Sequence, residues 1–182
     1  MTPFAALSRF CLVLCLLVSA ACASVSVDTY RGDEPALVPE QFFNGPLVAR
    51  GVIKNRSGEV IRRFTADINA YWVDGVGTLD EEFVFDDGEE SRRVWTLTPD
   101  GRGTYRATAG DVVGPGRALI SGNSMFLEYV LRVPYKNDSI DLAIDDRMYL
   151  VTPDLLINES VMRKFGFRVG EIVLTIQRQS SS

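Results

Sequence analysis

Histidine is absent from the 182 residues of this sequence. Its absence excludes Ser-His and Cys-His nucleophilic pairs, imidazole ligands to a metal ion, and the general base that enzymes use most often. Any catalysis would therefore depend on carboxylates, Lys, Arg or Tyr. We assign no catalytic residue on this basis, and we predict neither a metal site nor a cofactor.

Basic residues are scarce relative to acidic ones, with 19 Lys and Arg against 24 Asp and Glu and a formal net charge of −5. A surface that binds nucleic acid needs a concentrated basic face. The sequence shows no such concentration. We therefore expect no nucleic-acid partner and only weak electrostatic attraction to anionic lipid headgroups.

Cysteines and long apolar runs are also few. The three cysteines all lie near the N-terminus: Cys11, Cys15 and Cys22. No internal disulfide is therefore expected in the folded domain.

Residues 10–18 form a nine-residue apolar run followed by small residues, and no later segment approaches the ~20 apolar residues of a membrane-spanning helix. This pattern predicts a secretory signal peptide over residues 1–21.

The sequence Ser19-Ala20-Ala21-Cys22 resembles the bacterial lipobox, in which the cysteine becomes the acylated first residue of a lipoprotein. Ser19 stands where Leu is usual. We predict lipidation of Cys22, for example with palmitate, and several acyl chains on one residue would give stable membrane anchoring. Bacterial lipoproteins that stay at the inner membrane often have Asp directly after the acylated cysteine, and this sequence has Ala23 there. By this resemblance we expect the protein at the outer membrane, facing the periplasm. Cleavage by ordinary signal peptidase is the alternative, and it would give a soluble periplasmic protein.

The rest of the chain divides into three parts. Residues 22–38 are polar and without periodicity, which predicts a lipidated N-terminus and tether. Residues 39–179 are expected to form a single domain, and residues 180–182 a disordered tail. Pro39 and Gly45 bracket one expected helical turn, whose Phe42 and Phe43 would plug one end of the domain.

Alternating apolar and polar residues dominate this domain. The longest alternation, residues 60–72, would extend about 40 Å as a strand, a length that fits a curved barrel wall better than a flat sandwich. Turn residues separate ten such runs: 47–54, 60–73, 79–85, 92–98, 105–109, 118–121, 125–133, 140–151, 155–165 and 167–177. Asn55, Asn137 and Asn158, which begin Asn-x-Ser sequons, are interpreted as turn residues. We predict an all-β, antiparallel up-and-down β-barrel of about ten strands, with a β-sandwich as the alternative.

The hairpin over residues 79–97 carries opposite charges on its apolar face. If Gly88 takes the left-handed conformation in a three-residue loop, Glu81 lies opposite Arg93 and Leu79 lies opposite Trp95. The charges could form a buried ion pair that fixes the register. Alternatively, Arg93 could receive the carboxylate of a fatty acid while Glu81 holds Arg93 in place.

Two more polar residues lie on inward faces. Asp146 interrupts the apolar set of residues 140–150, and Tyr129 shares the apolar face of residues 125–131. A position at the barrel rim or in a bulge would expose Asp146 to solvent. An interior position would instead add its carboxylate and the Tyr129 hydroxyl to a binding site. The candidate ligand-binding residues are Glu81, Arg93, Trp95, Tyr129 and Asp146.

Four segments carry a resemblance to a known family: WVDGVGTLDEEFVFDDGEESRRVW, GDVVG, IDDRMYLV and NESVMRKFGFRVGE. They resemble a proteobacterial lipoprotein family known as domain of unknown function 3833. The resemblance implies a location in the cell envelope. The resemblance also favours a lipophilic ligand, because members of that family are often encoded near fatty-acid-modifying genes. The architecture also looks lipocalin-like, although Gly45-Pro46-Leu47 stands where the lipocalin Gly-x-Trp signature is expected.

Three functions follow as hypotheses. The first is an envelope lipoprotein whose barrel binds a lipophilic or amphipathic small molecule such as a fatty acid. The second is a structural or assembly lipoprotein whose barrel is filled by its own side chains. The third is a lipid-modifying enzyme that uses Glu81, Asp146 and Tyr129. A cavity of about 300 Å³ or more would favour binding, and a perturbed acid beside open space would be needed for catalysis.

Overall fold

The computed structural model describes residues 25–179. The predicted signal peptide, Cys22 and the expected tail over residues 180–182 lie outside the described residues. No helix in the described part is long and apolar enough to cross a membrane.

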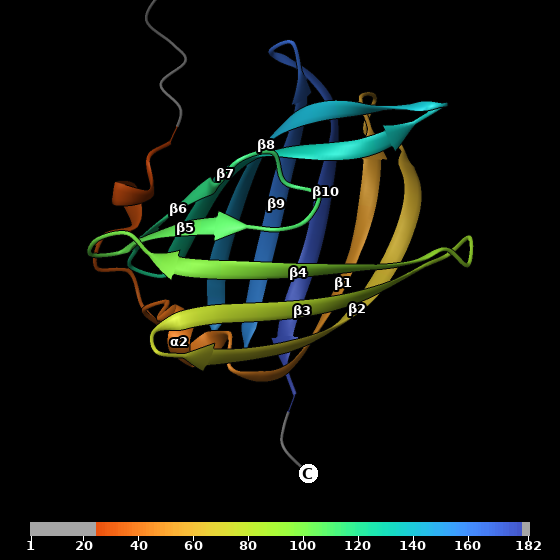
Figure 1. Cartoon of the computed structure of the whole chain (residues 1–182). Coiled ribbons are helices and arrows are strands. Elements are labelled where there is room, and N and C mark those ends of the chain that lie inside the picture. Colours follow the sequence, from red (N-terminus) through yellow and green to blue (C-terminus); the bar gives the residue numbers. More distant parts are fainter. Residues whose placement is uncertain (1–24, 180–182) are drawn as a thin grey trace, which may run out of the picture.

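The described chain is a closed barrel of ten strands in which each strand pairs antiparallel with the next and β1 closes on β10 (Figure 1). The strands are β1 Gly45–Asn55, β2 Val60–Val73, β3 Val76–Phe85, β4 Glu90–Pro99, β5 Thr104–Thr108, β6 Gly116–Ser121, β7 Ser124–Tyr135, β8 Asp138–Thr152, β9 Leu155–Lys164 and β10 Phe167–Arg178. The predicted all-β, up-and-down barrel is confirmed, and the β-sandwich is excluded. Closure leaves no free sheet edge at the β1–β10 seam, which an open sheet would expose.

Strand β2 shows why these residues form a barrel wall. Phe64, Ala66, Ile68 and Ala70 are buried, and the residues between them are exposed. Successive side chains of a strand point to opposite faces, so this alternation places one row inside the barrel and one row in water.

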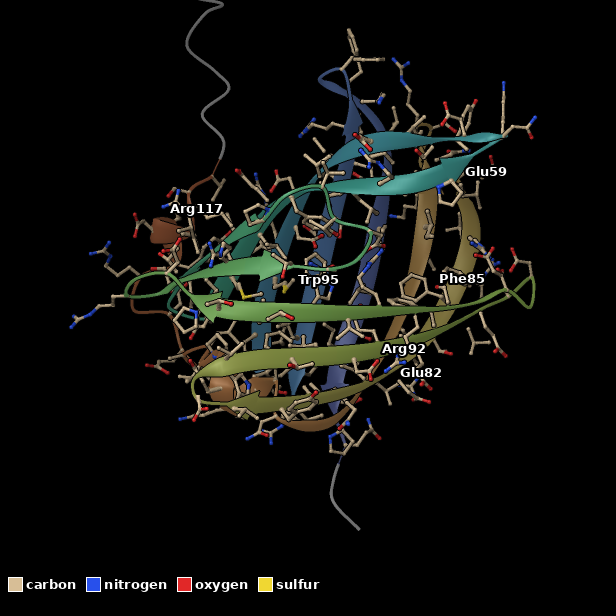
Figure 2. The ribbon with its side chains drawn as sticks, viewed as in Figure 1. Glu59, Glu82, Phe85, Arg92, Trp95 and Arg117 are labelled. Carbon is tan, nitrogen blue, oxygen red and sulfur yellow. The ribbon has the colours of Figure 1, made fainter. Side chains whose placement is uncertain are left out.

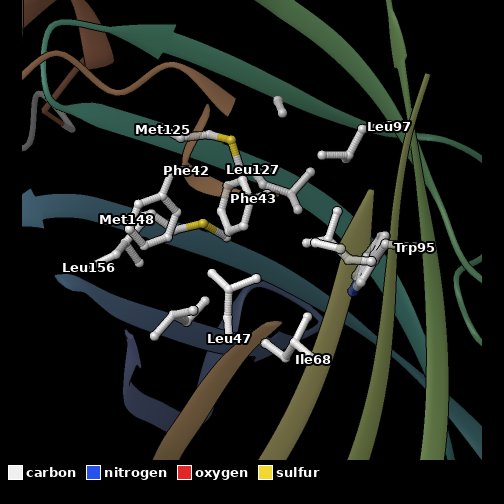
Figure 3. Close-up of a cluster of buried hydrophobic side chains, with 14 of the residues drawn as sticks. Phe42, Phe43, Leu47, Ile68, Trp95, Leu97, Met125, Leu127, Met148 and Leu156 are labelled. Carbon is white, nitrogen blue, oxygen red and sulfur yellow. The ribbon is translucent and has the colours of Figure 1, made fainter. Parts of the chain in front are cut away.

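The short helix α2 (Pro39–Phe42) closes one end of the barrel, as predicted. Pro39 begins the helix, where its missing N–H is not needed. Phe42 and Phe43 are buried among side chains from several strands (Figure 3). Trp72 Nε1 donates a hydrogen bond of 2.8 Å to the Phe43 carbonyl, which fixes this plug to the β2 wall.

The segment before the plug differs from the expected tether, because it packs against the barrel: Tyr30 lies on the outer face, and Leu37 joins the buried core. Residues 25–38 contain the 3₁₀ helix η1 (Val27–Tyr30), and Tyr30 lies edge-on to Tyr149 with ring centroids 5.3 Å apart. The backbone passes so close to Gly122 that a Cβ there would meet the Tyr30 carbonyl oxygen at 1.7 Å. Val27, Tyr30 and Leu37 supply the apolar contacts, but their irregular spacing gives no periodic signal.

One part of the barrel wall is incomplete. Strands β5 and β6 are short, and the pairing of β4 with β5 begins only at Thr96. Residues 90–95 of β4 therefore have no ladder partner on that side within the described chain. The loop of residues 109–115 runs between β4 and the β7–β8 hairpin (Figure 1) and joins β7 through a hydrogen bond from Val113 N to Val130 O (2.8 Å).

Candidate ligand-binding cavity

A cavity of about 110 Å³ lies inside the barrel next to the plug residue Phe43. Most of its lining is apolar or aromatic. Its polar side chains are Glu81, Arg93, Tyr129, Asp146, Asn158 and Ser160. All five candidate ligand-binding residues, Glu81, Arg93, Trp95, Tyr129 and Asp146, therefore line one space. The volume is smaller than the ~300 Å³ that we set as the mark of a binding pocket.

The predicted register of the β3–β4 hairpin is confirmed. Glu81 pairs with Arg93, Leu79 pairs with Trp95, and Gly88 has a φ of +84°. Glu82 and Arg92, labelled with Trp95 in Figure 2, lie on the outer face of the same hairpin. The three-residue loop therefore turns Glu81 and Arg93 to the cavity side, because a shift of one residue would exchange the two faces.

Arg93, however, bonds to a residue that the sequence did not indicate. Its Nη2 donates to Asp111 Oδ2 at 2.6 Å and its Nε to the same oxygen at 3.0 Å. The expectation that Glu81 holds Arg93 in place is therefore wrong. Asp111 belongs to the loop of residues 109–115, and a hydrogen bond from Arg132 N to Asp111 O (2.8 Å) ties this loop to β7. The Arg93–Asp111 ion pair thus bridges the incomplete part of the wall.

Glu81 is left without a hydrogen bond or ion pair to any described residue. Burial raises the pKa of Glu81 from 4.5 to about 7, the positive charge of Arg93 opposes this, and the Asp146 carboxylate adds to it. The side chain keeps some accessible surface because it faces the cavity. Near neutral pH this carboxyl group therefore exchanges between its protonated and ionised forms, and it can donate or accept a hydrogen bond.

Asp146 is an interior residue, neither at the rim nor in a bulge. It is 6% exposed, and its Oδ1 atom has no hydrogen-bond partner among the described residues. Burial raises the pKa of Asp146 from 3.8 to about 6, although the polar groups of Ser160, Tyr129 and Asn158 partly offset this. Burial also raises the pKa of Tyr129 well above its ordinary value, so the hydroxyl stays protonated.

Strand β9 adds two polar residues that sequence reasoning missed. Asn158 and Ser160 are buried, and Ser160 pairs with Asp146 across the β8–β9 ladder. Ser160 Oγ donates to Asn158 Oδ1 at 3.1 Å, while Asn158 Nδ2 has no partner in the described chain. The interpretation of Asn158 as a turn residue is wrong. The alternation of Leu156, Asn158 and Ser160 is the signal that could have placed both on the inner face.

The cavity thus combines an aromatic wall with a cluster of hydrogen-bonding groups. Trp95 and Tyr129 lie edge-on to each other, with ring centroids 5.1 Å apart, and join β4 to β7. Two carboxyl groups with raised pKa values line the same space, together with Asn158, whose Nδ2 has no partner among the described residues. Among residues 25–179, no group of three or more Asp, Glu, Cys or His side chains is arranged to hold a metal ion.

Comparison with known proteins gives a family and a fold. The family model described as "Protein of unknown function (DUF3833)" matches residues 16–178. No curated protein matches the chain. The S-type phycobiliprotein lyase CPES from Guillardia theta is similar in structure, with a TM-score of 0.59 and 16% sequence identity, over 80% of this chain and 95% of that one. A de novo designed fluorescence-activating β-barrel has a TM-score of 0.40 and 12% identity, over 79% and 99% of the two chains.

Proposed function

The chain belongs to the family of proteins of unknown function DUF3833, and we propose that its lipocalin-like barrel binds a small lipophilic molecule that carries a hydrogen-bond-donating group. The observation that carries this proposal is a pair of carboxyl groups in the largely apolar cavity lining: Glu81, which has no hydrogen bond to a described residue, and Asp146, whose Oδ1 atom has no partner there. Buried polar groups are normally hydrogen-bonded, and an exception in a cavity is a place for a ligand group.

The charges of the cluster favour a hydroxyl, amide or amine over the carboxylate of a fatty acid. The Arg93 guanidinium already bonds to Asp111, so it adds little positive charge for a second anion. An ionised carboxylate in the cavity would also face Glu81 and Asp146, which are negative when ionised. A donor group would instead form charge-assisted hydrogen bonds with these two acids.

The volume limits the part of the ligand that the cavity can hold. An engineered apolar cavity of about 150 Å³ in another protein holds benzene. A cavity of about 110 Å³ therefore accommodates a group of roughly that size or smaller. A short alkyl chain or a single ring fits this limit, and we choose six-carbon probes for the test.

At pH 7, hexanol and hexylamine are expected to bind at least about tenfold more tightly than hexanoate, because only hexanoate brings a negative charge toward two acids. Isothermal titration calorimetry measures the three affinities, and the emission of Trp95 reports occupancy of the cavity. Asp146→Asn should reduce the disadvantage of hexanoate relative to hexanol and hexylamine, whereas the outer-face variant Glu82→Gln should leave it unchanged. Tighter binding of hexanoate than of the other two probes would instead support the hypothesis that Arg93 binds the carboxylate of a fatty acid. If none of the three probes bound, a filled structural barrel would be favoured.

Acid–base catalysis is a second candidate function, because Glu81 meets the condition of a perturbed acid beside open space. A carboxyl group with a pKa of about 7 can give or take a proton efficiently at neutral pH. Any small molecule that co-purifies with the protein would be compared by mass spectrometry after incubation with the wild type and with Glu81→Gln. Conversion by the wild type alone would support catalysis, and identical spectra would leave binding as the function.

We also propose that the protein is an envelope lipoprotein anchored through Cys22 at the periplasmic face of the outer membrane. The support is the apolar run of residues 10–18 followed by Ser19-Ala20-Ala21-Cys22. Acyl chains on Cys22 would provide the membrane anchor.

Cys22→Ala is expected to prevent acylation and to leave the protein either uncleaved or soluble in the periplasm. Cell fractionation with a carbonate wash, together with mass spectrometry of the N-terminal peptide, measures both outcomes. Ser24→Ala, two residues away, serves as the control and should remain acylated. Acylated wild-type protein and a released variant would support the proposal, whereas a processed variant that stayed in the washed membrane would contradict it.

A further inference from the structure

The turn between β9 and β10 carries the two most exposed large hydrophobic side chains of the described chain. Phe165 is 86% exposed and Phe167 is 69% exposed. Figure 1 shows this hairpin projecting beyond the barrel wall. Scattered surface hydrophobics are common, but two exposed aromatic side chains two residues apart at a projecting tip call for an explanation.

The turn itself does not require these rings. Phe165 and Gly166 have φ values of +52° and +81°, a conformation for which hairpin turns favour Asn and Gly. A bulky residue with positive φ is uncommon. Neither ring belongs to the buried clusters of the barrel, so packing does not account for them either.

Basic residues flank the two rings. Arg163, Lys164 and Arg168 carry three positive charges within residues 163–168, and this segment contains no acid. Lys164 Nζ lies 4.9 Å from the Phe165 ring centroid and donates to the backbone carbonyl of Asp141 at 2.8 Å. Its charge also contributes to the lowered pKa of the Asp141 carboxyl, whose ion-pair partner is Arg132. Arg168 pairs with Glu171 at 2.9 Å, and its side chain is 42% exposed.

We infer that the β9–β10 tip docks on an anionic lipid surface, with Phe165 and Phe167 entering the interface and the basic side chains contacting the headgroups. Phe side chains on an interfacial segment enter the boundary between headgroups and acyl chains, and Lys and Arg near the surface are attracted to anionic lipids. The net charge of −5 led us to expect weak attraction. The tip differs because its positive charges lie together. At 0.1 M salt a charge acts over only about 10 Å, so the local charge of the tip decides its attraction to lipid more than the net charge of the chain does.

This inference rests on the tip and not on the cavity ligand. It is also separate from acylation of Cys22, because a chain held by its N-terminus need not bring the tip to the lipid. A test must therefore report contact at the tip itself rather than binding of the whole chain.

The test introduces a fluorescent residue at the tip of the full chain by Phe165→Trp. Vesicles contain phosphatidylcholine and phosphatidylglycerol with brominated acyl chains, which quench tryptophan on contact. Tyr71→Trp on the exposed outer face of β2 is the matched control. The native Trp72 and Trp95 are present in both variants and cancel in the comparison. We expect quenching and a blue shift of emission for Phe165→Trp only, together with a marked loss of both in about 1 M salt.

A second variant separates docking from folding. Combining Phe165→Ser with Phe167→Ser should lower the affinity of the tip for these vesicles at least about tenfold. Competition against the Phe165→Trp chain measures this, with Cys22→Ala in both chains so that acylation does not contribute. The thermal melting temperature of the double variant should stay unchanged, because both side chains are exposed. Absence of quenching, equal quenching of the Tyr71→Trp control, or equal binding to vesicles of pure phosphatidylcholine would overturn the inference and favour a protein partner for the tip.

Discussion

Lowering the pH from 8 to 5 is expected to stabilise the barrel by about 3 kcal/mol. The pKa of Glu81 is raised to about 7 and that of Asp146 to about 6, in both cases mainly by burial. Between pH 4 and pH 7 the folded state therefore holds more protons than the unfolded state. Stability falls as the pH rises through this range, because ionisation of either acid inside the barrel is unfavourable.

The magnitude follows from the size of the two pKa changes. Raising one carboxyl pKa by two or more units corresponds to about 3 kcal/mol. The Asp146 carboxylate contributes to the raised pKa of Glu81, so the two shifts are not independent, and water in the cavity would weaken the effect of burial. We therefore expect about 3 kcal/mol for the pair rather than the sum of two independent shifts.

Urea unfolding at pH 5 and pH 8 measures this difference. Glu81→Gln and Asp146→Asn should each flatten the dependence on pH and raise the stability at pH 8. Glu82→Gln, on the outer face of the same hairpin, should change neither. Below pH 4 the trend should reverse, because protonation of Asp80 and Asp141 removes ion pairs with Arg92 and Arg132 that lower their pKa values. A barrel more stable at pH 8 than at pH 5 would contradict the burial of the two acids.

Phe43→Ala is expected to lower the free energy of unfolding by about 3–5 kcal/mol. The Phe43 side chain is 1% exposed, lies edge-on to Phe42 with ring centroids 5.0 Å apart, and forms one wall of the cavity. Truncation removes these contacts and leaves a space that the closed barrel cannot collapse to fill. The hydrogen bond from Trp72 reaches the backbone carbonyl of residue 43, so the substitution does not remove its acceptor.

The same substitution should strengthen the binding of hexanol, because the space left by the ring adds to the cavity. Urea unfolding and calorimetric titration of one protein preparation measure the two effects together. Phe167→Ala is the matched control: its ring is exposed, so the change should cost less than about 0.5 kcal/mol in the absence of lipid. A loss below about 1 kcal/mol for Phe43→Ala, or weaker binding of hexanol, would show that the plug does not bound the cavity.

The sequence by itself determined the features that depend on local rules. Alternation along residues 60–73 predicted a strand with one buried row, because successive side chains point to opposite faces. Gly88 predicted the loop, and the loop predicted the pairing of Glu81 with Arg93, because loop length sets the register of a hairpin. Pro39 and the two phenylalanines that follow predicted the plug. Ten short runs joined by tight turns were enough to favour a closed barrel.

Only the tertiary structure decided what the inward residues meet. Asp111 reaches Arg93 through the path of a loop, and no periodicity in the sequence encodes that path. Val27 and Leu37 are buried at irregular spacing, Leu37 within the core cluster of the barrel, so their burial depends on the residues they meet. Asn158 and Ser160 join Asp146 because β9 lies beside β8. The volume of the cavity depends on how side chains from nearly all the strands pack together, and such packing is a property of the closed barrel that no single strand carries.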